Sequence, residues 1–119
     1  MGYVYREQRN YEAAHARYRE AIELFSELGH KRGVARSLEG LACLAADRGH
    51  AGRALRLAAA AAHLRQLISA PLTQAEQAKL DRNLLSAWES VGEVEGKGAW
   101  AEGSAMGIES AIQYSLQES

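Results

Sequence analysis

Residues 34–68 read VARSLEGLACLAADRGHAGRALRLAAAAAHLRQLI and carry two helical patterns in succession. The first pattern covers about residues 31–48, and its apolar or small side chains recur at intervals of three and four. These positions are Val34, Leu38, Leu41, Ala42 and Ala45. Such spacing puts them on one face of an α-helix. Gly49 interrupts the pattern, and a second helix is expected over about 51–68, because Pro71 prevents its continuation.

The same spacing continues on the N-terminal side of this segment. Over residues 11–28 one stripe of a helix is formed by Ala14, Tyr18, Ala21, Ile22 and Phe25. Asn10 is placed to cap the start of that helix, since its side-chain oxygen can accept from the first amides. Gly29 stands where a left-handed residue commonly ends a helix.

On the C-terminal side, Thr73 and Glu76 have the spacing of a capping box at the start of another helix. Its apolar stripe consists of Leu80, Leu84, Trp88 and Val91. We expect that helix to end at Gly92, a short helix around 99–102, and a final helix marked by Ile108, Ile112 and Leu116. No window alternates as a strand does. The sequence therefore predicts an all-α protein.

Composition limits the class of protein. The chain has 119 residues, 47% of them hydrophobic and 24% charged, with a formal net charge of −1. A binder of nucleic acid normally carries a basic excess, so we expect no direct nucleic-acid binding. No apolar run approaches the roughly 20 residues that span a bilayer, so we expect no membrane association. With a single cysteine and no signal-peptide pattern, the sequence predicts a cytoplasmic location.

The charge is unevenly distributed. Residues 31–65 hold seven Lys and Arg against two Asp and Glu, a net charge of +5, whereas residues 66–119 hold three against eight, a net charge of −5. A basic middle and an acidic tail can attract each other within one molecule or between copies. We interpret this polarity as a determinant of packing register or partner choice.

A shift of 40 residues aligns two helical hairpins. In the first copy the frame is occupied by Gly2, Tyr5, Ala14, Tyr18 and Ala21. In the second copy it is occupied by Leu38, Leu41, Ala42, Ala45, Ala54, Ala58 and Ala61. Small side chains recur where two helices must approach closely, and larger ones fill the grooves beside them.

This frame resembles the tetratricopeptide repeat, with alanine in the second copy where Tyr5 and Tyr18 stand in the first. The resemblance extends to four later segments. They are 37–42 (SLEGLA), 70–72 (APL), 100–106 (WAEGSAM) and 109–114 (ESAIQY). Together they are similar to the C-terminal repeat region of bacterial ATPase-containing transcription regulators of the LuxR or MalT type. The resemblance implies two α-hairpins over residues 1–70 and capping helices of the same domain over residues 71–119.

The resemblance also implies a site, because the first helix of each tetratricopeptide hairpin lines a concave groove. Carried over by position, that groove presents Tyr3, Arg6, Glu7, Arg36, Glu39, Cys43 and Asp47. The expected function is protein–protein interaction with a protein or peptide partner, in a bacterial signalling or transcription regulator. The alternative is a repeat domain that senses a small inducer, which an enclosed apolar pocket near Tyr3, Cys43 and Trp88 would favour. Exposed polar positions without a function remain an equal reading of the groove.

The first hairpin lacks most of its leading helix, because Met1 already occupies a mid-helix position of the frame. An uncapped end of a repeat array leaves an apolar surface exposed. Either the chain is a fragment of a longer regulator, or it covers that surface by forming a homodimer.

Signals for chemistry are weak. Residues 92–98 (GEVEGKG) contain glycines and a lysine. A phosphate-binding loop, however, needs four residues between its first glycine and its Gly-Lys pair, and then Ser or Thr. Here three residues intervene, and Gly98 follows the lysine. The four histidines are scattered, which disfavours a metal site, and no base is spaced to activate Cys43. We therefore expect no catalysis, no metal and no cofactor.

Overall fold

The computed structural model describes the backbone of residues 2–117 and the side chains of residues 10–117. Five α-helices follow one another in this part of the chain, and no residue of it is in a strand. The helices are α1 (Gly2–Leu28), α2 (Lys31–Asp47), α3 (Ala51–Leu67), α4 (Gln74–Ser104) and α5 (Ile108–Leu116). The all-α prediction is confirmed.

Local sequence signals explain most of the helix ends. Gly29, directly after α1, and Gly49, two residues after α2, adopt left-handed φ values of 68° and 78°, a conformation that costs glycine nothing. The His30 Nδ1 atom accepts from the Gly33 amide at 2.9 Å and so caps α2. At the start of α4 the Glu76 amide donates to the Thr73 Oγ1 atom at 3.1 Å, and the Thr73 amide donates to the Glu76 carboxylate at 2.9 Å. The predicted capping box is therefore formed.

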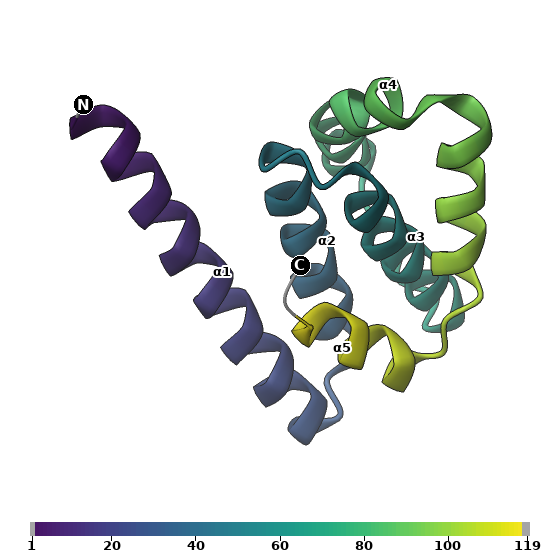
Figure 1. Ribbon diagram of the computed structural model, residues 1–119. Helices are drawn as coiled ribbons and strands as arrows, with labels where there is room; N and C mark the ends of the chain where they lie inside the picture. The colour runs from purple at the N-terminus through teal and green to yellow at the C-terminus, as the bar shows by residue number, and fades with distance from the viewer. Residues whose placement is uncertain (1, 118–119) are drawn as a thin grey trace.

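Helices α1 to α4 pack in sequence order, each antiparallel to the next (Figure 1). Helix α2 lies between α1 and α3, and α4 packs on α3 and also contacts α2. The short α5 lies across this row and contacts α1, α2 and α3. The connection between α3 and α4 contains the boundary predicted at residue 70.

Alanine and glycine allow these helices to lie close together. The α3 residues Ala54, Ala58 and Ala61 are buried, and the largest fully buried side chains around them include Leu38, Leu55 and Leu57. On α2, two glycines leave space for aromatic rings of α1. The Phe25 ring lies over Gly33, and the Tyr18 ring lies over Gly40. A Cβ atom at position 40 would stand 2.3 Å from the Tyr18 ring, so α1 can seat its aromatic residues only on glycine.

The N-terminal hairpin differs from the prediction. No break occurs at Asn10, and α1 is one continuous helix of 27 residues, so residues 2–28 do not form the predicted first hairpin. The physical reason is that an interior asparagine costs a helix only about 0.7 kcal/mol, and neither glycine nor proline stands near residue 10 to interrupt it.

Helix α4 also differs, because its second part is longer than the short helix predicted around 99–102. Gly92 has φ 81° and ψ 168°, so helical segments 74–91 and 93–104 meet at a corner. Inside that corner the Trp88 and Trp100 rings lie 5.9 Å apart between centroids. The second segment then packs on α3 through Gly103, where an added Cβ atom would stand 2.2 Å from the Arg56 carbonyl oxygen. Packing thus compensates for the glycines in this segment.

Helix α5 is held at its C-terminal end by one arginine of α3. The Arg53 Nη2 atom contacts the carbonyl oxygens of Tyr114 at 3.2 Å, Ser115 at 3.1 Å and Gln117 at 2.8 Å. The Arg53 guanidinium also lies 4.9 Å from the centroid of the Tyr114 ring. The last carbonyls of a helix lack partners within it, and a cation satisfies them here.

None of the helices in the described range is long and apolar enough to cross a membrane.

Candidate functional site

The predicted groove residues of α2 share one face of that helix, but they differ in environment. Arg36 and Asp47 are exposed, Cys43 is half-buried, and the side chain of Glu39 is only 13% exposed. The other three predicted residues, Tyr3, Arg6 and Glu7, lie outside the side chains that the structure describes.

Glu39 forms a nearly buried ion pair with Arg65 of α3. The Arg65 Nε atom donates to Oε2 of Glu39 at 2.5 Å, and its Nη2 atom donates to Oε1 at 3.0 Å. Its Nη1 atom donates to the Ala70 carbonyl oxygen at 2.8 Å. The hydrogen bonds to Glu39 hold the pKa of Arg65 above its usual value, with burial acting in the opposite direction. This side chain therefore stays cationic and joins α2, α3 and the loop before α4.

Cys43 lies against α4, where the Asn83 amide donates to its Sγ atom at 3.5 Å. Burial is the largest influence on this thiol and raises its pKa, while the hydrogen bond from Asn83 lowers it and the nearby Asp47 and Glu39 carboxylates raise it. A thiol with a raised pKa is a poor nucleophile at neutral pH. Cys43 is thus suited to packing and not to covalent chemistry.

A cleft of about 500 Å³ opens beside the Glu39–Arg65 pair, between α3 and the two segments of α4. We call it the α3–α4 cleft. Its lining residues are Glu39, Ala58, Ala62, Arg65, Gln66, Ser69, Pro71, Leu72, Thr73, Gln74, Gln77, Leu80 and Trp100. Glu39 and Arg65 are the only charged side chains among them, and they neutralise each other. The remaining surface is apolar or uncharged polar.

Among the predicted groove residues whose side chains the structure describes, Glu39 lines this cleft, and Arg36, Cys43 and Asp47 do not. The sequence places Arg65 in the basic middle segment but does not predict its ion pair, because Glu39 is 26 residues away on another helix. Leu80 was expected in a capping helix, and Trp100 belongs to segment 100–106, which carries part of the family resemblance. Pro71 and Thr73 indicated a break between two helices at this place, but no convergence of side chains.

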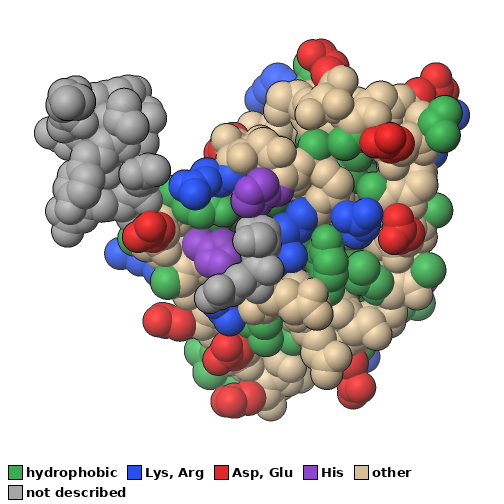
Figure 2. All heavy atoms as spheres, in the orientation of Figure 1, with side chains coloured by type: hydrophobic (Ala, Val, Ile, Leu, Met, Phe, Trp, Pro, Cys, Tyr) green, Lys and Arg blue, Asp and Glu red, His purple; other side chains and the backbone are tan. Residues whose placement is uncertain are grey.

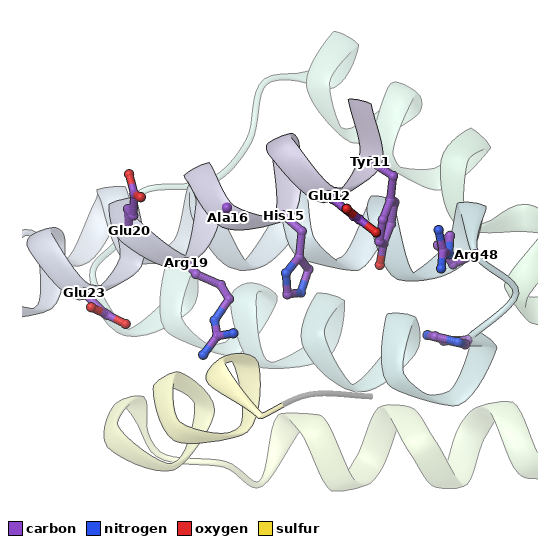
Figure 3. A pocket seen from close by; sticks show the side chains of 9 residues that line it. Tyr11, Glu12, His15, Ala16, Arg19, Glu20, Glu23 and Arg48 are labelled. Carbon is purple, nitrogen blue, oxygen red and sulfur yellow. The ribbon is translucent and has the colours of Figure 1, made fainter. Parts of the chain in front are cut away.

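A second cleft, of about 750 Å³, runs along α1 and reaches the turn between α2 and α3 (Figure 3). At one end the Tyr11 ring lies between a cationic neighbour, Arg48, and an aromatic neighbour, His15. The Arg48 guanidinium carbon is 4.2 Å from the Tyr11 centroid, and the His15 ring is stacked 6.0 Å away on the other side. Figure 3 shows His15 and Arg19 pointing into the cleft.

This second cleft does not select one sign of charge. Its lining includes Arg19 and Arg48, but also Glu12, Glu20 and Glu23. In the face shown in Figure 2, histidine and basic side chains gather near the middle, and acidic side chains lie toward the edge. A ligand of either charge would meet like charges here, which weakens any specific recognition.

An enclosed pocket near Tyr3, Cys43 and Trp88 would favour the inducer alternative. The side chain of Tyr3 lies outside the described range, and neither Cys43 nor Trp88 lines the two clefts described above. Trp88 instead lies over Gly96 and beside Trp100, within the corner of α4.

For metal chemistry, the described residues contain no group of three or more His, Cys, Asp or Glu side chains that could hold an ion. No protein-family model matches the chain, and neither the curated proteins nor the solved structures include a significant match.

Proposed function

We propose that this chain is a non-catalytic protein–protein interaction module that binds a peptide segment of its partner in the α3–α4 cleft. The observation that carries the proposal is the character of that cleft, which combines apolar walls, several uncharged amide side chains and one internally neutralised ion pair. Amides both donate and accept hydrogen bonds, as a peptide backbone does. Such a surface favours a polypeptide over a charged metabolite.

The wider setting that we propose is the tetratricopeptide-like C-terminal part of a bacterial signalling or transcription regulator. The sequence resemblance supports this setting, and the sequential antiparallel packing of α1 to α4 is compatible with it. An in-frame upstream ATPase domain in the coding sequence would support it further, and an unrelated upstream domain would contradict it.

Selection from a peptide-display library tests the binding function. Ala62 lies on the exposed rim of the cleft, so Ala62→Phe places a ring over the opening. Ala78 is equally exposed on α4 but does not line the cleft, so Ala78→Phe is the matched control. We expect peptides that bind the unmodified chain and the Ala78→Phe variant but not the Ala62→Phe variant. If no peptide distinguishes the two variants, the cleft is not the binding site.

A small apolar ligand is the second candidate, because about 500 Å³ falls within the usual volume of small-molecule pockets. Peptide length separates the two candidates. A peptide site gains affinity when an apolar amino-acid amide is extended to a hexapeptide, whereas a small-molecule site is already filled by the single residue.

Self-association is also proposed, through the exposed flank of α1 that borders its contact with α2. Leu24 and Leu28 are 53% and 69% exposed there, and Ala13, Ala14 and Ala21 line a shallow cleft beside Tyr18. We expect light scattering at about 100 μM to give the mass of a dimer, and Leu24→Glu with Leu28→Glu to restore the monomer. A monomer without these substitutions would contradict the proposal.

A further inference from the structure

Arg65 retains hydrogen-bonding capacity at the wall of the α3–α4 cleft. A guanidinium group has five N–H donors. The structure gives Arg65 three bonds, two to Glu39 and one to the Ala70 carbonyl. One N–H on Nη1 and one on Nη2 therefore have no acceptor among the described residues, although the residue is only 9% exposed. Two unused donors in a nearly buried group favour an acceptor supplied by a ligand.

The charge around these donors limits what that acceptor can be. The Arg65 charge is already balanced by Glu39, with both side chains largely removed from water. Glu76 also acts on Arg65 from outside the lining, and its carboxylate is bonded to the Thr73 amide. Arg36 acts on Glu76 in turn, so two cationic and two acidic groups already balance here. A ligand carboxylate would therefore add an unpaired negative charge, and desolvating it is costly. A neutral carbonyl oxygen satisfies the donors without that cost.

Other walls of the same cleft provide an apolar surface. Leu80 comes from the first segment of α4 and Trp100 from the second, while Ala58 and Ala62 of α3 leave space between the helices. Gln77 donates to Asp81 through Nε2 at 2.9 Å, which leaves its carbonyl oxygen available to accept a hydrogen bond. The cleft thus offers donors and an acceptor next to an apolar surface.

We infer that the α3–α4 cleft takes an uncharged, apolar residue from within a partner polypeptide, with its side chain against Leu80 and Trp100 and its backbone carbonyl accepting from Arg65. This inference rests on the proposed function and specifies the class of peptide. It excludes recognition of a chain-terminal carboxylate or of an acidic motif in this cleft.

Two small probes test the inference directly. N-acetyl-leucine N-methylamide presents a leucine side chain between two neutral amides, and N-acetyl-leucine ends in a carboxylate. Both are titrated into the ¹⁵N-labelled full chain, and the Trp100 indole and Arg65 Nε signals are followed by NMR. We expect millimolar binding of the methylamide at these signals, and at least about tenfold weaker binding of the carboxylate, which corresponds to 1.4 kcal/mol.

Variants identify the groups responsible. Ala62→Phe should abolish the shifts and Ala78→Phe should preserve them. The double substitution Glu39→Leu with Arg65→Met removes both charges while keeping apolar volume, an exchange that buried ion pairs often tolerate. We expect it to weaken methylamide binding and to remove the preference over the carboxylate. If the double variant does not fold, the comparison of the two probes still decides.

The outcomes separate this inference from the proposed function. Equal or tighter binding of the carboxylate overturns the inference, as do display-selected peptides whose central residues are charged, and in both cases the peptide-binding function stands. Failure of both probes while selected peptides still bind also overturns it. If neither probes nor selected peptides bind the cleft, the proposed function itself fails.

Discussion

Two glycines of the second α4 segment should respond to alanine with opposite signs. At Gly103 the added Cβ atom would stand 2.2 Å from the Arg56 carbonyl oxygen and 2.8 Å from the Ala59 Cβ atom. Carbon and oxygen normally approach to about 3.3 Å, so the two helices must separate by roughly 1 Å. At Gly98 an added Cβ atom meets nothing within 4 Å.

The magnitudes follow from these distances. Forcing extra volume between packed helices costs about 1–3 kcal/mol. At Gly103 the obstacle is largely backbone, which cannot rotate away, so we expect a cost near the upper end of that range. A gain of up to about 1 kcal/mol in helix propensity offsets part of it. Gly98→Ala should show that gain alone and stabilise the chain by up to about 1 kcal/mol.

Urea denaturation followed by circular dichroism at 222 nm measures both free energies of unfolding. Thermal midpoints should change in the same directions, by about 4 °C per kcal/mol for a chain of this length. Equal effects of the two substitutions, or a Gly103→Ala variant as stable as the unmodified chain, would refute the close packing of this segment on α3.

Four further predictions concern a helix cap and charged or reactive groups. Thr73→Ala should lower the free energy of unfolding by about 1 kcal/mol, because it removes a helix cap. The hydrogen bonds from Thr73 hold the pKa of Glu76 below its usual value. The charged carboxylate therefore stabilises the fold above its unfolded pKa, and this stabilisation is lost as pH falls. Urea titrations should accordingly show a smaller destabilisation by Glu76→Ala at pH 3 than at pH 7. Arg65→Met alone leaves Glu39 unpaired and should cost about 3–5 kcal/mol, whereas adding Glu39→Leu should restore most of it, as a double-mutant cycle would reveal. Cys43 should react with a disulfide reagent at pH 8 more slowly in the folded chain than in urea, because burial raises its pKa, and equal rates would contradict that environment.

The sequence predicted the central hairpin well, and for a clear physical reason. Helices α2 and α3 end within one residue of the expected positions, because Gly29, Gly49 and Pro71 act locally and need no tertiary partner. Asn10 misled because a residue that favours caps is also tolerated inside a helix. The tetratricopeptide-like frame requires a helix break near Asn10, but α1 is continuous through that position.

The remaining differences depend on contacts between distant residues. Three helical glycines, Gly96, Gly98 and Gly103, argue locally against the second α4 segment, yet the Trp88 ring covers one of them and α3 covers another. The α3–α4 cleft was missed for the same reason. The Glu39–Arg65 pair joins two helices, and Trp100 reaches the cleft only because the chain turns at Gly92.

The single arginine that holds α5 has a consequence for the order in which the chain folds. A helix of nine residues is too short to persist alone in water, so α5 has to form on a surface that already exists. Arg53 presents that surface only when α3 is in place. We therefore expect the C-terminal helix to form only after α3 is in place, and its amide exchange to report the local release of this contact before the global unfolding of the protein.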